Sequence, residues 1–307
     1  PVFEAAVYPC VLLLEKEDSI SEKVFQTMKD VENPARSAII HPSVFNSDLF
    51  WDKYFINQTQ LNIILKISNQ PKLSTYSVDI KGAATVAEAY EIKQVLSELD
   101  SSQTEPYFRF INTGTIDKYK SLWGTKKTQY IKDAYQHPVV KTTDLQAINP
   151  NRVAQSSAPK IIIAGMSSSI EAVYDEGEIL AGKSTSIIRG EVHLLKVILA
   201  VINSKLLDFW LRINFNSLKM AGGYINVGVN EISSLPIHAS AHNNSSLIDC
   251  VNRLLIQPDD TISLDEIDNI VYHLYDLTYD EVLIVDPQTP ISREQYESFN
   301  LETHGQP

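Results

Sequence analysis

Short apolar runs punctuated by glycine and proline between Pro106 and Gly190 constrain the fold most. The runs "YFRFI", "KIIIAGM", "IEAVYD" and "TSIIRG" are rich in β-branched and aromatic residues. Such runs between turn residues predict strands. Helical spacing of apolar residues returns at Val192 and extends to about Ile213, and further helices are predicted at 245–256, 263–276 and 278–285. The chain is therefore predicted to be an α+β protein with a mixed β-sheet and helices.

The N-terminal part has a different pattern. Val7 to Leu14 is an apolar run that ends in charged residues, which is typical of a buried strand of a parallel sheet. Neighbouring strands are not evident downstream, so we expect the chain to be a fragment of a larger protein. The stretch "TVAEAYEIKQVLSELD" predicts a helix in which Thr85 and Glu88 have capping-box spacing. Its apolar stripe is predicted to include Val86, Ala89, Tyr90, Leu96 and Leu99.

Charge is distributed unevenly along the 307 residues. The formal net charge is -12, but 13 acidic and only two basic residues follow position 248. The rest of the chain is almost neutral, and residues 117–132 carry five lysines against Asp117. Tyr119, Trp123 and Tyr130 lie among these lysines. The global charge therefore does not exclude a nucleic-acid partner, although it predicts weak long-range steering.

Composition and motifs exclude several classes of protein. No apolar run reaches the ~18 to 20 residues that span a bilayer, and no signal peptide is evident. Cys10 and Cys250 are isolated, which excludes a disulfide scaffold or a thiolate zinc cluster and fits a reducing cytoplasm. The sequence contains no phosphate-binding glycine loop, nucleophile elbow or zinc-protease motif. We therefore assign no catalytic residue, no metal ligand and no cofactor ligand.

Three polar segments have the composition of a nucleic-acid surface. They are "NTGTIDKYKSLWG", "GKSTSIIR" and "SLKMAGGYINVG". Glycine lets the backbone approach a ligand, lysine and the polar side chains bind phosphates or base edges, and aromatic rings stack on bases. The alternative is that glycine and polar residues simply form turns, with tyrosine and tryptophan half-buried in packing.

The order of these segments resembles the C-terminal half of adenine-specific DNA methyltransferases of restriction-modification systems, which end in a TaqI-like specificity domain. The resemblance includes "GAATVAEAYEIK", "FRFINTGTIDKYKSLWG", "PKIIIAGMSSSIEAVYDEGEILAGKSTSII", "GGYINVGVNEISSLPI" and the closing helix "IDNIVYHLYDLTYDEVLIV". It covers most of residues 1–285. No one motif decides the assignment, but several occur in the right order.

The resemblance implies a larger parent protein in which catalysis and target recognition belong to different domains. In that family a catalytic half binds S-adenosylmethionine and grips a flipped adenine with an Asn-Pro-Pro-Tyr motif. This chain has no such motif, so methyl transfer is expected of a catalytic half preceding it, with or without a fused endonuclease. Residues 1–32 would end that α/β methyltransferase domain, residues 33–240 would be the target-recognition domain, and residues 241–307 would be an acidic helical region.

The sequence therefore predicts target recognition on double-stranded DNA, in the cytoplasm and without a membrane partner. The first candidate DNA contacts are Lys118, Tyr119, Lys120, Trp123, Lys126 and Lys127. The second group is Lys183, Ser184, Lys219, Tyr224 and Asn226. One alternative is a protein-interaction module of a restriction or defence complex that uses the acidic helices. Another is a nuclease, although no Asp…Glu-x-Lys cluster follows a strand.

Overall fold

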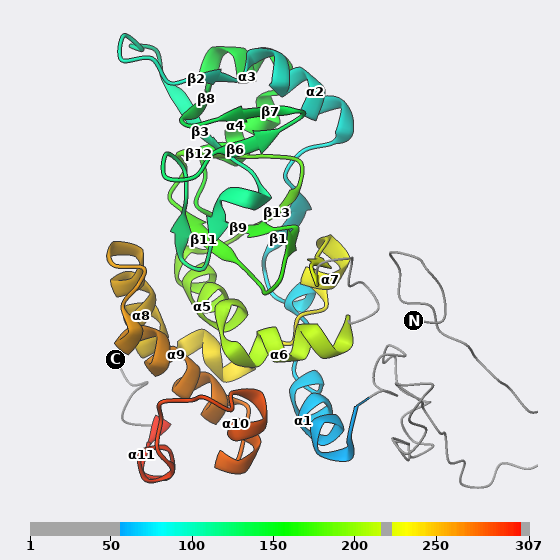
Figure 1. The fold of residues 1–307 in the computed structure, drawn as a ribbon, viewed down its shortest axis with the longest axis vertical. Coiled ribbons are helices and arrows are strands. Elements are labelled where there is room, and N and C mark those ends of the chain that lie inside the picture. The colour runs from blue at the N-terminus through cyan, green and yellow to red at the C-terminus, as the bar shows by residue number, and fades with distance from the viewer. Residues whose placement is uncertain (1–55, 216–222, 302–307) are drawn as a thin grey trace, which may run out of the picture.

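A computed structural model describes residues 56–215 and 223–301, which form an elongated molecule in three tiers (Figure 1). A four-stranded sheet with three short helices lies at the top, and a second four-stranded sheet lies in the middle. A group of helices forms the base. The predicted strand at 7–14 and the predicted domain boundary at 32/33 lie outside the described residues.

The middle sheet is antiparallel throughout, in the order β1-β13-β9-β11. Its strands are β1 (Asp79–Gly82), β9 (Lys160–Ala164), β11 (Ala172–Asp175) and β13 (Thr185–Arg189). Side chains along a strand point alternately to its two faces. In β9, Ile161 and Ile163 pack into the helical core, whereas Ile162 and Ala164 pack toward the upper sheet. The run "KIIIA" is continuously apolar because both faces of this strand are covered.

The upper sheet is mixed, in the order β12-β3-β8-β2, with β12 parallel to β3 and the other pairs antiparallel. Its strands are β2 (Ser97–Glu98), β3 (Tyr107–Ile111), β8 (Pro138–Lys141) and β12 (Ile179–Ala181). Three helices pack with it around Phe108, Phe110 and Val140. They are α2 (Val86–Val95), α3 (Thr142–Ile148) and α4 (Pro150–Ser156). The prediction of an α+β fold with a mixed sheet is confirmed.

The base is built around a buried helix that packs under the middle sheet. Its helices are α1 (Gln58–Ser68), α5 (Val192–Asn203), α6 (Lys205–Asn214), α7 (Val229–Ser233), α8 (Ser245–Ile256), α9 (Thr261–Leu274), α10 (Tyr279–Val285) and α11 (Arg293–Glu297). Helix α5 lies between β9 and β11 on one side and α8 and α9 on the other. Ser204 separates α5 from α6 because its hydroxyl accepts the Leu207 N–H as an N-cap. Across the described residues, no helix has the length and apolar character needed to cross a bilayer.

Three two-stranded ribbons project from these layers. They pair β4 (Ile116–Asp117) with β5 (Lys120–Ser121), β6 (Thr128–Tyr130) with β7 (Asp133–Tyr135), and β10 (Met166–Ser167) with β14 (Ile225–Asn226). They carry most of the segments that the sequence marked as polar and glycine-rich. The ribbons therefore decide which candidate residues meet.

Helix α2 differs from its prediction in length and in its buried face. It ends at Val95, and Glu98 follows in strand β2, where its carboxylate accepts the N–H groups of Gln136 and His137. Val86 and Tyr90 are 59% and 58% exposed, so the predicted stripe is wrong at these positions. The buried face is formed by Ala89 and Leu96, as predicted, together with Ile92. The predicted capping box of Thr85 and Glu88 is confirmed.

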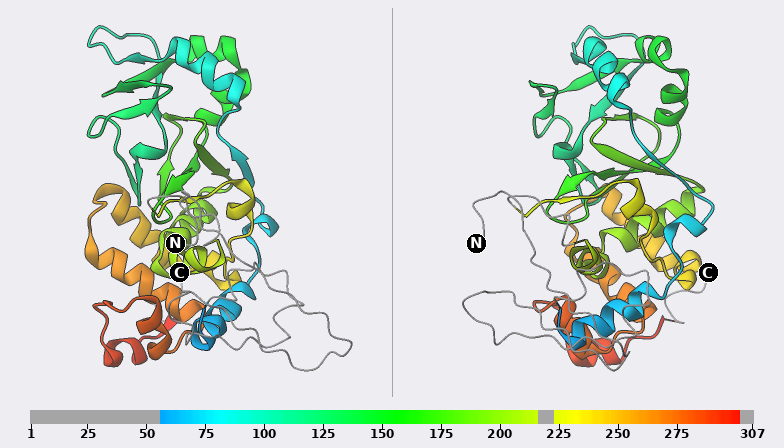
Figure 2. Two further views of the ribbon diagram at one scale, coloured as in Figure 1. Left: turned by 45° about the vertical axis from the view of Figure 1, so that its right-hand side comes forward. Right: turned by 90° about the vertical axis from the view of Figure 1, so that its right-hand side faces the viewer.

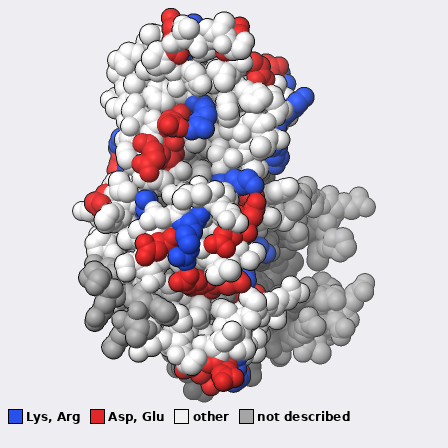
Figure 3. Space-filling model, turned by 90° about the vertical axis from the view of Figure 1, so that its left-hand side faces the viewer, with Lys and Arg blue, Asp and Glu red and all other residues white. Residues whose placement is uncertain are grey.

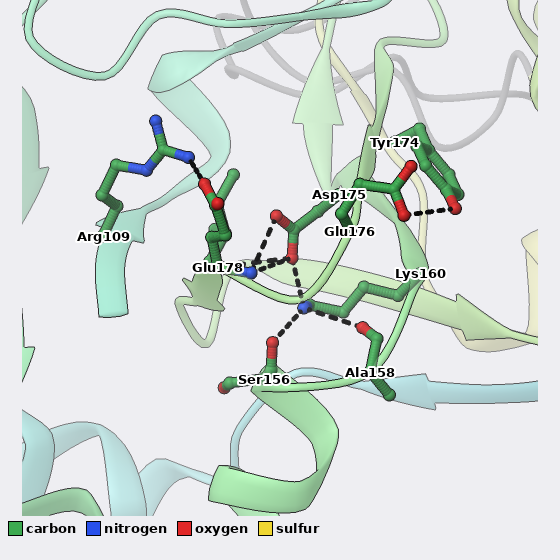
Figure 4. A network of polar contacts seen from close by, with 9 residues as sticks. Arg109, Ser156, Ala158, Lys160, Tyr174, Asp175, Glu176 and Glu178 are labelled. Carbon is green, nitrogen blue, oxygen red and sulfur yellow. Dashed lines mark hydrogen bonds and ion pairs between the residues drawn. The ribbon is translucent and has the colours of Figure 1, made fainter. Parts of the chain in front are cut away.

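A buried ion pair joins β9 to β11 close to the upper sheet (Figure 4). The Lys160 Nζ lies 2.5 Å from the Asp175 carboxylate and also donates to the carbonyl oxygens of Ser156 and Ala158. Asp175 in turn accepts the backbone N–H groups of Glu178 and of Ile179, the first residue of strand β12. The pair thus fixes the junction of α4, the middle sheet and the upper sheet.

Candidate nucleic-acid interface

Lys118 and Lys120 are engaged within the molecule. The Lys118 Nζ donates to the carbonyl oxygen of Asn203 at 2.6 Å, and the Lys120 Nζ lies 3.5 Å from the Asp259 carboxylate. These contacts tie the β4–β5 ribbon to the end of α5 and to the α8–α9 turn. On the left-hand side of the molecule, basic side chains lie beside acidic ones instead of forming a continuous basic patch (Figure 3).

Tyr119 lies in the core, which corrects its prediction as a DNA contact. Its side chain is 3% exposed, and its backbone N–H donates to the carbonyl oxygen of Ala172 at 2.9 Å. Burial raises the pKa of the Tyr119 hydroxyl well above its ordinary value. The residue adopts a φ of +61°, so the ribbon turns at this point and directs the ring inward. A ring in this position cannot stack on a base.

Trp123 holds the loop that leads to the next two lysines. Its indole N–H donates to the carbonyl oxygen of Pro138 at 2.8 Å, and its ring meets His137 edge to face at 5.2 Å. Trp123 is half-buried and held by these contacts, which agrees with the alternative that its ring packs within the molecule. Lys126 and Lys127 follow it, are exposed, and form no ion pair with a described residue. They remain available to bind phosphate.

The β6–β7 ribbon is anchored to α2 along one face. Thr128 and Tyr130 are buried, and the Tyr130 hydroxyl donates to the carbonyl oxygen of Ala89 at 3.1 Å. From α2, the Lys93 Nζ lies 2.5 Å from the Asp133 carboxylate and 4.9 Å from the centre of the Tyr135 ring. In the right-hand view of Figure 2 the ribbon projects from the left side of the upper tier. Its outer face is thus held rigidly toward solvent.

The turn of this ribbon is strained. Ile131 and Lys132 connect the strands with φ values of +41° and +69°. A two-residue turn with positive φ at both positions is favourable for Asn-Gly and costs other residues about 1 to 2 kcal/mol each. Strain of this kind persists where the surrounding structure fixes it, and it concentrates at functional sites.

A Lys132→Gly substitution should therefore raise the free energy of unfolding by about 1 kcal/mol, because glycine adopts positive φ without a clash. Chemical denaturation followed by circular dichroism measures the change. A Lys132→Ala variant is the control: it removes the same charge but keeps the strain, so its stability should stay near that of the wild type. Equal stability of the two variants would contradict the prediction.

The second predicted group converges around Gly165. The Gly165 N–H donates to the carbonyl oxygen of Ser184 at 3.0 Å, and the Gly165 carbonyl accepts the Val227 N–H at 2.9 Å. A Cβ at position 165 would lie 2.5 Å from the Ser184 oxygen, so only glycine permits this approach. The adjacent Asn226 pairs with Met166 across β10 and β14.

The structure thus brings together Lys183, Ser184, Tyr224 and Asn226, all of which are exposed. Tyr224 is 48% exposed, and Met166, which pairs with Asn226, is 42% exposed. The Thr113 hydroxyl donates to the Met166 carbonyl oxygen at 3.1 Å and links this group to the segment after β3. Lys219 lies outside the described residues.

A hollow of about 200 Å³ connects the ribbon to the second group. It lies among α2, the end of β3, the β6–β7 turn and the loop between β12 and β13. Its lining is Val86, Ala89, Tyr90, Asn112, Tyr130, Ile131, Lys183 and Ser184. The Asn112 amide donates to the carbonyl oxygen of Gln129 at 3.2 Å, whereas its buried Oδ1 has no partner among the described residues. An unpaired buried polar atom is costly, which marks this position as unusual.

We call this surface the ribbon face: the β6–β7 ribbon with Lys126 and Lys127 just before it, the hollow, and the loops around Gly165. Four of its members were not among the predicted DNA contacts, and these are Tyr90, Asn112, Gln129 and Lys132. Tyr90 was assigned to the core of α2, although Ala89, Ile92 and Leu96 give a stripe that leaves it outside. No sequence signal placed Gln129 on an outer face, because no turn residue marks the hairpin at Ile131.

Residues 110–237 match the family model of the TaqI-like C-terminal specificity domain. Over these residues the chain is therefore similar to a TaqI-like specificity domain. The matched residues include the ribbon, the loops around Gly165 and helices α5 to α7, whereas α2 precedes them. No curated protein matches the chain. Among solved structures, the chain is similar to the type IIL restriction-modification enzyme MmeI in complex with DNA.

The similarity to MmeI has 12% sequence identity and a TM-score of 0.32. It covers 77% of this chain and 36% of MmeI, so the chain spans about a third of that protein's length. Among the residues that the structure describes, no group of three or more His, Cys, Asp or Glu residues could hold a metal ion.

Proposed function

We propose that this chain selects the DNA target sequence for an S-adenosylmethionine-dependent, adenine-specific methyltransferase of a restriction-modification or phage-defence system. The observation that carries the proposal is the ribbon face of the specificity domain. It combines Lys126, Lys127, Lys132 and Lys183, none of which pairs with a described acid, with exposed tyrosines and amides. Lysines bind phosphates and fix register, and amide side chains read base edges.

The partner in this proposal is a catalytic half of the same parent protein, which would bind S-adenosylmethionine. The sequence contains no Asn-Pro-Pro-Tyr motif, so we assign no step of methyl transfer to any residue here. The chain would instead hold the duplex so that the catalytic half reaches one adenine. Cleavage by the parent protein is a separate property on which the ribbon face has no bearing.

The salt dependence of binding tests the proposal. Labelled duplex DNA is titrated with the chain, alone and joined to the catalytic half, at ~50 mM and ~200 mM salt. If Lys126 and Lys127 each neutralise one phosphate, the double alanine variant should reduce the slope of log K against log salt by about 2. The matched control replaces Lys72 and Arg293, which lie outside the ribbon face, and should leave the slope unchanged. Absence of DNA binding by the joined protein would refute the proposal.

A second candidate function is protein interaction through the acidic helices. Ile256 and Ile262, which flank the α8–α9 turn, are 88% and 76% exposed. Large apolar side chains this exposed are typical of contact surfaces. If the turn docks a protein partner, replacing both isoleucines by serine should weaken association with the catalytic half in sedimentation experiments without DNA. Unchanged association would reject this role, and it would leave the DNA proposal intact.

A further inference from the structure

The outer face of the β6–β7 ribbon presents Gln129 with little around it. Gln129 lies between the buried Thr128 and Tyr130, so its side chain points to solvent. Its cross-strand partner is Ala134, which is exposed and too small to cover it. The Gln129 side-chain amide forms no hydrogen bond with a described residue, whereas its backbone oxygen is held by Asn112. The amide is therefore free to bind while its backbone is fixed.

The shape and charge of the ribbon fit the major groove. That groove is about 12 Å wide in B-DNA and admits a two-stranded β-ribbon. Lys126 and Lys127 precede β6 at one end of the ribbon, and Lys132 lies in the turn at the other end. Lysines at both ends can contact phosphates on either side of a groove, while the middle of the ribbon approaches base edges.

The chemistry of glutamine then selects the base. A glutamine amide accepts from the adenine N6 amino group and donates to adenine N7, and no other base offers this pair of groups in the major groove. We propose that Gln129 reads an adenine of the target through its major-groove edge. This inference rests on the proposed function, and it goes further by naming the residue, the groove and the base.

The rigidity of the ribbon supports this role. The contacts of Tyr130 with Ala89 and of Lys93 with Asp133 leave little freedom for β6 to move. A bidentate contact requires an amide plane held in one orientation, and anchored strands hold such a group better than a free loop. Only two residues, Ile131 and Lys132, connect the strands, so Gln129 lies near the projecting end of the ribbon.

The test uses the chain joined to its catalytic half and a randomised duplex library, with bound sequences read by sequencing. Wild-type protein should select adenine at a fixed position. Gln129→Ala should lose that preference at this position alone and weaken binding to the selected sequence by about 5- to 150-fold. Its binding to unselected DNA and its salt slope should stay unchanged, because Gln129 contacts no phosphate. Gln146→Ala, on the exposed surface of α3, is the matched control.

Gln129→Glu sharpens the result, because a carboxylate accepts from the cytosine amino group and should shift the preference from adenine to cytosine. Unchanged preference at every position in both variants would overturn the inference and leave the proposed function standing. If wild-type protein binds DNA without selecting any sequence, the proposed function itself fails. Circular dichroism of the variants confirms that each one folds.

Discussion

A Lys160→Met substitution is expected to lower the free energy of unfolding by about 3 to 5 kcal/mol. The Lys160 side chain is 1% exposed and the Asp175 side chain 3% exposed, so neither charge has water to replace its partner. Burial lowers the pKa of Lys160, and the Asp175 carboxylate opposes that shift. Removal of the ammonium leaves a carboxylate buried among backbone groups at the junction of the two sheets. Urea denaturation of wild type and variant measures the difference.

Two further variants separate the charge from the packing. The double variant Lys160→Met/Asp175→Leu removes both charges, so it should recover a large part of the loss. Lys81→Met removes one half of the exposed Lys81–Asp79 pair and should change stability by less than about 1 kcal/mol. If Lys160→Met were as mild as Lys81→Met, the buried pair would have no structural role.

Three strands of the middle sheet, β9, β11 and β13, were predictable because their side chains are buried on both faces, whereas β1 has no apolar run and was not predicted. Ile161 to Ile163 are apolar in succession, and such a short run is easily assigned to a buried strand. Helices α8 and α10 were predictable for a similar reason, since each has a clear apolar stripe and a capping residue. The long helical run after Val192 was harder to divide, because the break at Ser204 depends only on local hydrogen bonds of this residue with Val201 and Leu207.

The ribbon face was only partly predictable, because tertiary contacts created it. The sequence identified Lys126 and Lys127 from charge, and Lys183, Ser184, Tyr224 and Asn226 from their glycine-rich surroundings. It could not predict that Gly165 brings Ser184 next to Val227, or that the hollow joins the ribbon to Lys183 and Ser184. It also could not predict that Tyr119 is buried while the lysines next to it are not. The positive φ of Tyr119, which directs its ring toward the core, cannot be read from composition.

Glu88→Gln should lower the free energy of unfolding at pH 7 by about 3 kcal/mol. The Glu88 carboxylate accepts two hydrogen bonds from Arg152 of α4, at 2.8 and 3.0 Å. It also accepts the Thr85 N–H, so it closes the capping box and ties α2 to α4. Arg152 is the main cause of a pKa lowered to about 2 from an ordinary 4.5, and burial opposes it. A shift of this size corresponds to about 3 kcal/mol.

The sign of the pH dependence follows from the lowered pKa. Because the folded protein binds this proton more weakly than the unfolded chain, the stabilisation is complete above about pH 4.5 and is lost as pH falls toward 2. The difference between wild type and Glu88→Gln should therefore shrink from about 3 kcal/mol at pH 7 toward zero near pH 2. Glu91→Gln, on the exposed side of α2, should change stability by less than about 0.5 kcal/mol. A difference that stays constant across this pH range would show that Glu88 stabilises α2 by shape and not by charge.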